Sequence, residues 1–298
     1  MERVRLGKTD MEVSRLGFGG AETGFGQHAA EQVAAILNVA LDAGLNVVDT
    51  AECYGTGEET IGKAVSSRRS DYYLFTKCGH SVIPDLPDWD PRMLEQSIDR
   101  SLKLLRTDHV DLLQVHSCDE AILRAGEVIE VVQRAKAAGK TRYIGYSGDG
   151  AAAHYALQCG AFDTLQTSLS IADQEGIDLN LPLARAQGVG VIVKRSIANA
   201  AWRYGATCDN DYHRPYWERL RVLDYPFLKG DPAEAAATAL RFTLSLPGVQ
   251  NILIGTTNPG RWKENMATIA RGPLPQAEVD AIRARWKAVA KPDWVGQI

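Results

Sequence analysis

Residues 47–57 read VVDTAECYGTG, and this stretch indicates how the chain is built. Val47 and Val48 lead into an acid, Asp49, and Tyr54 stands just before a glycine turn. A short apolar run bounded by turn residues is typical of a buried strand. We therefore expect a buried strand whose carboxyl end delivers Asp49 and Tyr54 into a pocket.

Two further apolar runs end in the same manner. The run at residues 73–77 ends at Lys77, and the run at 110–116 ends at His116. Each run is followed by a helical pattern, which indicates parallel strands, because a parallel crossover needs a helix or its equivalent. The carboxyl ends of parallel strands meet on one side of a sheet. We therefore expect these proton-active side chains to share one catalytic face.

The alternation of strand and helix runs through the whole chain. The expected strands are residues 15–19, 46–49, 73–77, 110–116, 142–146, 163–166, 189–193 and 251–254. The expected helices include 29–43, 58–65, 121–138, 181–187 and 232–246, with others that start at residues 91, 151 and 259. Eight such units favour a (β/α)8 TIM barrel, which typically needs about 250 residues. No G-x-G-x-x-G motif follows the first strand, which argues against an open doubly wound sheet.

Two segments stand outside this alternation. Residues 4–13 read as a hairpin that serves as a plug or lid, and residues 196–231 form a long, aromatic-rich irregular connection. The loop at 78–90 and Trp294 are expected to join the long connection over the substrate. We expect residues 1–298 to form a single barrel domain with extended loops on its C-terminal face.

Composition excludes several classes of protein. The 298 residues are 45% hydrophobic and 23% charged, which is enough for a full core and excludes a disordered chain. Lysine plus arginine number 33 against 37 acidic residues, a net charge of −4, and no basic run indicates nucleic-acid binding. With no signal segment or apolar run of about 18 residues, we expect a cytoplasmic protein without a membrane span. We also expect a monomer.

The five cysteines are scattered without a C-x-x-C pair, which indicates reduced thiols. Cys53, Cys78 and Cys118 lie next to or near Tyr54, Lys77 and His116, so a metal site built from Asp, His and Cys has to be weighed. Zinc prefers closely paired ligands on a turn. The pattern therefore favours packing cysteines and no metal.

The four polar groups make a proton-transfer site. Tyrosine has an ordinary pKa of about 10, so it needs a nearby cation to favour its anion, and Lys77 can supply one. Asp49 can pair with Lys77 and offset the cost of burying the ammonium. His116 can hydrogen-bond to a substrate oxygen or exchange a proton with Tyr54. Together they can give a proton to a developing alkoxide.

A phosphate site is expected after the last strand. Gly255, Thr256 and Thr257 precede a helix opened by Asn258 and Pro259. Barrels often bind phosphate at such a helix N-terminus, where free backbone N–H groups face the anion. The basic residue of the first helical turn, Arg261, adds a fixed cation suited to phosphate.

Six stretches that together cover almost the entire chain share one recognisable pattern. They are VRLGKTDMEVSRLGFGG (4–20), VVDTAECYGTGEETIGKAV (47–65), LFTKCG (74–79), SLKLLRTDHVDLLQVH (101–116), RYIGYSG (142–148) and ILIGTTNPGRWKENM (252–266). In their order and spacing they resemble the aldo-keto reductases. The resemblance implies a (β/α)8 barrel and an NADPH-dependent carbonyl reductase or the reverse dehydrogenase. It places a catalytic tetrad on Asp49, Tyr54, Lys77 and His116, with Tyr54 as the general acid.

The resemblance also implies a set of cofactor contacts. Arg261 would meet the ribose 2′-phosphate, Glu264 and Asn265 the adenine end, and Ser147 and Gln166 the nicotinamide amide. The complete expected set is Gly20, Asp49, Ser147, Gln166, Lys194, Arg195, Gly255, Thr256, Thr257, Arg261, Glu264 and Asn265.

Three positions depart from the family pattern. Ser147 is followed by Gly148 where many members have asparagine, and Lys194 with Arg195 replaces a tyrosine that stacks on the nicotinamide. Gly255 replaces a basic residue. We predict NADPH over NADH, with NADH possible, and a small carbonyl or sugar substrate such as a sugar-derived or aromatic aldehyde.

Three other functions remain open at this stage. A metal-dependent barrel hydrolase could use Asp49, His116 and Cys118, and a Schiff-base lyase could use Lys77 as its nucleophile. A barrel that binds dinucleotide without turnover could serve as a sensing subunit. The phosphate loop with Arg261 is unnecessary for the first two.

Overall fold

The computed structural model describes residues 1–26 and 28–297, and its centre is a closed barrel of eight parallel strands. Each strand pairs with the next in chain order, and the last strand pairs with the first. The barrel strands are β3 (Leu16–Gly19), β4 (Val47–Asp49), β5 (Tyr73–Cys78), β6 (Val110–His116), β7 (Thr141–Ser147), β8 (Thr164–Ser168), β9 (Gly190–Lys194) and β10 (Val249–Ile254). The predicted (β/α)8 barrel is confirmed.

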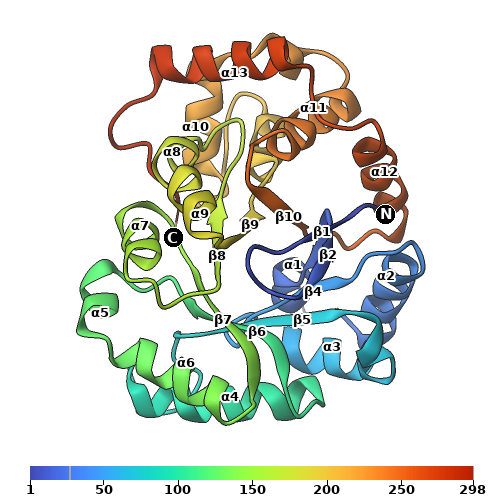
Figure 1. The fold of residues 1–298 in the computed structure, drawn as a ribbon. Coiled ribbons are helices and arrows are strands. Elements are labelled where there is room, and N and C mark those ends of the chain that lie inside the picture. Colours follow the sequence, from blue (N-terminus) through green and yellow to red (C-terminus); the bar gives the residue numbers. More distant parts are fainter. Residues whose placement is uncertain (27, 298) are drawn as a thin grey trace.

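Helices surround the barrel (Figure 1). They are α1 (Ala21–Phe25), α2 (Ala30–Asp42), α3 (Gly57–Val65), α4 (Pro91–Leu105), α5 (Glu120–Ala125), α6 (Glu127–Ala137), α7 (Gly150–Gln158), α8 (Glu175–Leu179), α9 (Leu181–Gln187), α10 (Arg214–Leu223), α11 (Pro232–Leu244), α12 (Pro259–Ala270) and α13 (Gln276–Val289), with 3-10 turns η1 (Ser66–Asp71), η2 (Ala198–Tyr204) and η3 (Pro226–Lys229).

Helix α4 shows how local sequence sets these boundaries. The Asp90 side chain accepts hydrogen bonds from the backbone N–H groups of Arg92 and Met93, and Pro91 occupies the first turn, where it loses no helical bond. The helix ends where Arg106 adopts the left-handed conformation.

The N-terminal hairpin is a plug at the amino-terminal mouth of the barrel. Its strands are β1 (Arg3–Arg5) and β2 (Glu12–Ser14), and the hairpin side chains Leu6, Met11 and Val13 are fully buried. They pack in one cluster with inward-facing strand residues such as Val47 and Phe75. The hairpin therefore closes the mouth opposite the strand ends that carry Asp49 and His116.

Two sequence predictions were wrong in detail. The helix expected over 121–138 is broken at Gly126, whose φ of 87° is a conformation that a helix interior cannot hold, and it becomes α5 and α6. The connection 196–231, expected to be irregular, contains η2, α10 and η3. Within it, Tyr216 is fully buried beneath the surface of the molecule.

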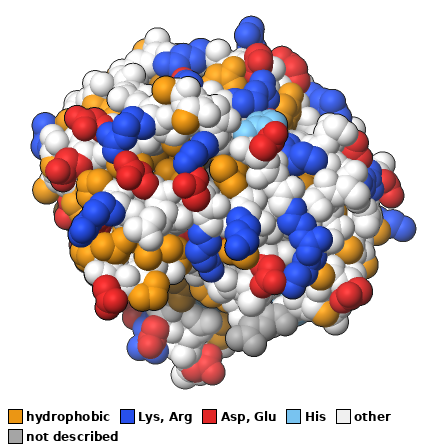
Figure 2. Space-filling view, turned by 90° about the horizontal axis from the view of Figure 1, so that it is seen from below, with side chains coloured by type: hydrophobic (Ala, Val, Ile, Leu, Met, Phe, Trp, Pro, Cys, Tyr) orange, Lys and Arg blue, Asp and Glu red, His pale blue; other side chains and the backbone are white. Residues whose placement is uncertain are grey.

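The surface carries both signs of charge. Lysine and arginine side chains are interspersed with acidic ones on the face shown in Figure 2. Within the described residues, no helix combines the length and the apolar character needed to span a lipid bilayer.

Candidate active site

The buried ion pair between Asp49 and Lys77 lies at the centre of the site. Asp49 ends β4 and Lys77 lies near the end of the neighbouring β5, and the two are 2% and 1% exposed. Lys77 Nζ donates to Asp49 Oδ1 at 2.5 Å and to the Thr50 carbonyl at 2.7 Å. Burial lowers the pKa of Lys77, but the charges of Asp49 and Tyr54 outweigh this and hold it above its usual range. Lys77 therefore stays an ammonium, which disfavours it as a Schiff-base nucleophile.

A short chain of amides supports the other oxygen of Asp49. Gln166 Nε2 donates to Asp49 Oδ2 at 2.8 Å, and Gln114 Nε2 donates to the same oxygen at 3.2 Å. The Ser147 hydroxyl donates to Gln166 Oε1 at 3.2 Å. Of the two residues predicted for the nicotinamide amide, Gln166 thus bonds directly to the ion pair, and Ser147 is connected to it through Gln166.

Tyr54 lies in the turn between β4 and α3, partly buried. Lys77 Nζ is 4.9 Å from the centroid of its ring, and the His116 ring meets it edge-on at a centroid distance of 6.0 Å. Burial raises the pKa of Tyr54, and the charge of Lys77 opposes that rise. We expected the ammonium to make this phenol acidic. Burial is the larger effect, so the phenol keeps its proton at neutral pH.

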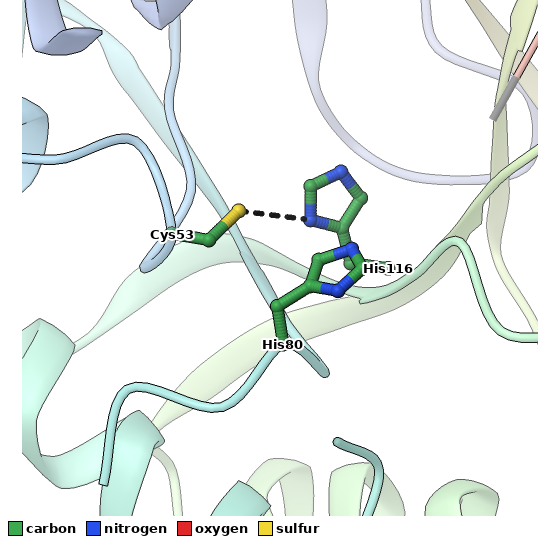
Figure 3. Close-up of side chains that lie close together, drawn as sticks. All are labelled: Cys53, His80 and His116. Carbon is green, nitrogen blue, oxygen red and sulfur yellow. Dashed lines mark hydrogen bonds between the residues drawn. The ribbon is translucent and has the colours of Figure 1, made fainter. Parts of the chain in front are cut away.

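His116 ends β6 and is 8% exposed. Its Nδ1 is 3.6 Å from Cys53 Sγ, and its ring centroid lies 4.8 Å from that of His80 (Figure 3). Its backbone carbonyl accepts a hydrogen bond from Trp89 Nε1. Burial, followed by the charge of Lys77, holds the pKa of His116 well below its usual range. The imidazole is therefore neutral at physiological pH.

The expected phosphate loop follows β10. The Thr256 hydroxyl accepts from the Asn258 backbone N–H at 3.1 Å, and Asn258 Oδ1 accepts from that of Gly260 at 2.9 Å, so the loop is pinned to the start of α12. Gly20, also expected at the cofactor, is the residue just before α1 and donates its N–H to the Asp49 carbonyl at 2.8 Å.

The first turns of α12 present polar groups outward. Arg261 is exposed and pairs with Glu264 at 2.8 Å, and Thr257 is exposed beside them. Among the described residues, the buried Asn265 Nδ2 has no hydrogen-bond partner. An orphaned amide close to an exposed cation at a helix start fits a phosphate-bearing nucleotide with a polar base.

Lys194 and Arg195 are held by an acid that the sequence reading had not singled out. Lys194 Nζ lies 2.9 Å from Asp149 Oδ2, and Arg195 lies 3.6 Å from the same oxygen. Burial opposes ionisation of Asp149, but these two cations hold its pKa below its usual range. Arg195 also donates to the Gln297 carbonyl and to the Tyr212 hydroxyl. The two cations thus bind the protein's own groups in this structure.

The ligand set considered for a metal hydrolase does not assemble. Both carboxylate oxygens of Asp49 are taken by hydrogen bonds, and Cys118 is buried, with 1% of its surface exposed. In the described part of the chain, the cluster that could hold an ion is Cys53, His80 and His116. All five cysteines are free thiols in the structure.

Sequence reasoning missed three residues of this site. Gln114 carried a usable signal, because it is a polar residue inside the apolar run of β6, two positions before His116 and therefore on the same face. Asp149 follows the departure at Gly148 and could have been matched with Lys194. His80 gave no signal, because a loop position has no periodicity.

The chain was compared with known proteins. The family model described as Aldo/keto reductase family matches residues 15–287. The chain is 29% identical to L-galactose dehydrogenase of Arabidopsis thaliana over 90% of this chain and 88% of that protein. It is 26% identical to the NADH-specific methylglyoxal reductase of Escherichia coli, over 90% and 94% of the two chains.

A comparison with solved structures also indicates the aldo-keto reductases. The holo form of an aldo-keto reductase from Bacillus halodurans superposes with a TM-score of 0.83 at 25% identity, covering 99% of both chains. The match spans the barrel, the N-terminal hairpin and the C-terminal helix. The chain belongs to the aldo/keto reductase family and is an oxidoreductase of that family.

Proposed function

We propose that this protein interconverts a carbonyl and an alcohol with a nicotinamide nucleotide, and that Tyr54 is its general acid and base. The observation that carries the proposal is the position of Lys77, which is bonded to Asp49 and lies 4.9 Å from the centroid of the Tyr54 ring. A phenol beside a fixed ammonium can release a proton to a substrate oxygen as negative charge develops there.

The protonation state of Tyr54 suits reduction of a carbonyl to an alcohol. Tyr54, with its pKa raised by burial, carries its proton at neutral pH and can donate it. As the phenolate forms, Lys77 stabilises it without moving, because its ammonium is already held by Asp49 and Thr50. In the oxidising direction the same phenolate accepts the alcohol proton.

His116 acts as a neutral hydrogen-bond donor to the substrate oxygen. Burial and nearby cations keep its imidazole uncharged, so one ring nitrogen carries a proton that it can share. Its proximity to Tyr54 places both donors on the same side of the pocket. Two donors fix the carbonyl in one orientation.

The nucleotide, when bound, supplies or accepts the hydride. Ser147 and Gln166 would bind its amide, since they already form a connected pair ending on Asp49. Arg261 and Asn265 would bind its phosphate and adenine end from the first turns of α12. Lys194 and Arg195 both pair with Asp149, so they would contact the nucleotide only if they gave up this ion pair or bound both groups at once.

We propose NADPH as the preferred nucleotide, with NADH as the second. The support is Arg261, an exposed guanidinium at a helix start whose present partner, Glu264, is also exposed and easily displaced. NADH is kept as the second choice because one relative is named as NADH-specific. We propose a sugar or a small aldehyde as substrate, because the Phe25 ring packs against Tyr54 close to the polar groups of the site and one relative is named for a sugar.

Nucleotide titration followed by a carbonyl screen tests this proposal. The protein is titrated with NADPH and with NADH while cofactor fluorescence is followed, and aldoses, dicarbonyls and aromatic aldehydes are then offered. We expect tighter binding of NADPH and its oxidation by at least one carbonyl. Tight binding without any turnover would point to a sensing subunit, and failure to bind either nucleotide would reject the proposal.

A further inference from the structure

Three side chains of types that bind metals lie close together beyond the carboxyl ends of β4, β5 and β6 (Figure 3). Cys53 comes from the turn after β4, His80 from the loop after β5, and His116 from the end of β6. One donor atom from each lies within 4.8 Å of the others. Carbonyl reduction by Tyr54 and Lys77 gives no role to Cys53 or His80.

The spacing fits a tetrahedral ion. Zinc binds a thiolate at about 2.3 Å and an imidazole nitrogen at about 2.0–2.1 Å, so tetrahedral ligands would place sulfur and nitrogen about 3.5 Å apart. Cys53 Sγ and His116 Nδ1 are 3.6 Å apart. Two of the three ligands are therefore already at the separation that an ion requires.

The third ligand is held in the way that metal-binding histidines are held. His80 Nδ1 lies 3.3 Å from Asp88 Oδ2, which leaves Nε2 as the ring nitrogen available to an ion. The backbone N–H of His80 donates to Glu52 Oε1 at 2.9 Å. A carboxylate behind the ring and a pinned backbone orient His80, while its partly exposed side chain can close the remaining distance.

The surroundings select the kind of ion. Lys77 and Lys194 put positive charge near His116, which opposes any cation, so an ion at this place has to be held by the strength of its bonds to the donor atoms. One sulfur and two imidazole nitrogens suit zinc and its neighbours among the transition metals. Magnesium and calcium, which prefer oxygen ligands, should not bind there.

We propose that Cys53, His80 and His116 form a binding site for one zinc ion, with a fourth position open to the pocket. The second part of the inference rests on the proposed function. An ion at this site engages His116 and places its open position beside Tyr54, so zinc should compete with the carbonyl substrate and not with the nucleotide.

Cobalt spectroscopy tests binding without any need for activity. The purified, metal-free protein is titrated with Co²⁺, and we expect one equivalent to give tetrahedral visible bands and a thiolate-to-cobalt band that Zn²⁺ abolishes and excess Mg²⁺ does not. Cys53→Ser should remove the thiolate band. Asp88→Asn, which keeps all three ligands, should weaken zinc binding about tenfold or more.

Matched variants separate this site from casual surface binding. His80→Gln should lose tight zinc binding, whereas His109→Gln, which removes a surface histidine that also lies against a carboxylate, should not. Cys159→Ser, which removes another partly buried thiol, should keep the thiolate band. Thermal melts show whether each variant is folded.

The outcomes are distinct. Binding without a thiolate band, or binding that survives both Cys53→Ser and His80→Gln, overturns the site. Zinc inhibition that is competitive with the nucleotide overturns the second part of the inference. If no carbonyl is ever reduced, the proposed function fails, but the spectroscopic result still decides whether the zinc site exists.

Discussion

The ammonium of Lys77 lies 4.9 Å from the centroid of the Tyr54 ring. Two effects meet at this phenol, since burial raises its pKa and the ammonium lowers it. Burial is the larger effect and keeps the phenol protonated. The ammonium acts mainly on the phenolate, whose negative charge it stabilises. A group that is protonated at rest and stabilised after it has lost its proton has the properties that a general acid needs.

Replacement of Tyr54 by phenylalanine should remove the proton donor and leave the ring in place. We expect kcat to fall about 10²–10⁴-fold, which is the usual contribution of a positioned acid. The affinity for NADPH, followed by fluorescence, should stay near wild type. A variant that keeps more than a tenth of wild-type turnover would contradict the role assigned to Tyr54.

Loss of Lys77 should be costly for folding as well as for turnover. Lys77→Met leaves Asp49 as a buried, unpaired carboxylate, and breaking such a pair costs about 3–5 kcal/mol. The double variant Lys77→Met with Asp49→Asn removes both charges and should regain much of that stability. Denaturant unfolding of the three proteins measures this difference.

The single and the double variant also separate an effect on folding from an effect on catalysis. Neither variant should recover turnover, because Tyr54 lacks its ammonium in both. A double variant that is no more stable than Lys77→Met would contradict this expectation. It would show that the Asp49 carboxylate does not need the charge of Lys77, despite the 2.5 Å contact between them.

Replacement of Arg261 by alanine should change the choice of nucleotide. A guanidinium bound to a phosphate contributes about 1.5–3 kcal/mol, so KM for NADPH should rise about 10–100-fold, while KM for NADH and kcat should change little. Arg271→Ala is the matched control, since Arg271 is also exposed and ion-paired but lies just past the other end of α12. Equal effects on both nucleotides would argue against a 2′-phosphate contact.

Much of the fold could be predicted because its signals are local. Apolar runs such as residues 110–116 and helix caps such as Asp90 are visible in the sequence, and alternation of strand and helix leaves few topologies. The break at Gly126 was missed because both flanking segments keep a helical pattern. Helix α10 was missed although its buried residues Tyr216, Leu220 and Leu223 recur at helical spacing, because they form a narrow apolar stripe in a segment that is otherwise polar.

The residues of the site that lie at strand ends could be predicted from the sequence, and the loop residues Asp149 and His80 could not. Asp49, Lys77 and His116 end buried strands, so their meeting followed from parallel pairing alone. Asp149 and His80 lie on loops, and their contacts with Lys194 and Asp88 depend on how those loops pack in three dimensions. The direction of the Tyr54 pKa likewise required the actual burial of the phenol.

A buried acid away from the tetrad should make stability depend on pH. Asp173 is 1% exposed and accepts a hydrogen bond from the Tyr216 hydroxyl at 2.7 Å. Burial and the nearby charge of Asp149 raise the pKa of Asp173 to about 7. An unfolded aspartate titrates near 4, so between about pH 4 and 7 the folded state holds more protons than the unfolded state. Stability from this group therefore falls as the pH rises through that window.

Asp173→Asn removes the titration and keeps an oxygen that can accept from Tyr216. We expect wild type and variant to have similar stability near pH 5, and the variant to gain on the order of 2 kcal/mol relative to wild type at pH 8. Thermal melts at both pH values measure this change. Asp209→Asn, at an exposed position, serves as the control and should show no such difference. A variant that is less stable than wild type at pH 8 would contradict this expectation. It would mean that nearby Arg219 stabilises the ionised Asp173 carboxylate, so that the pKa of Asp173 is not raised.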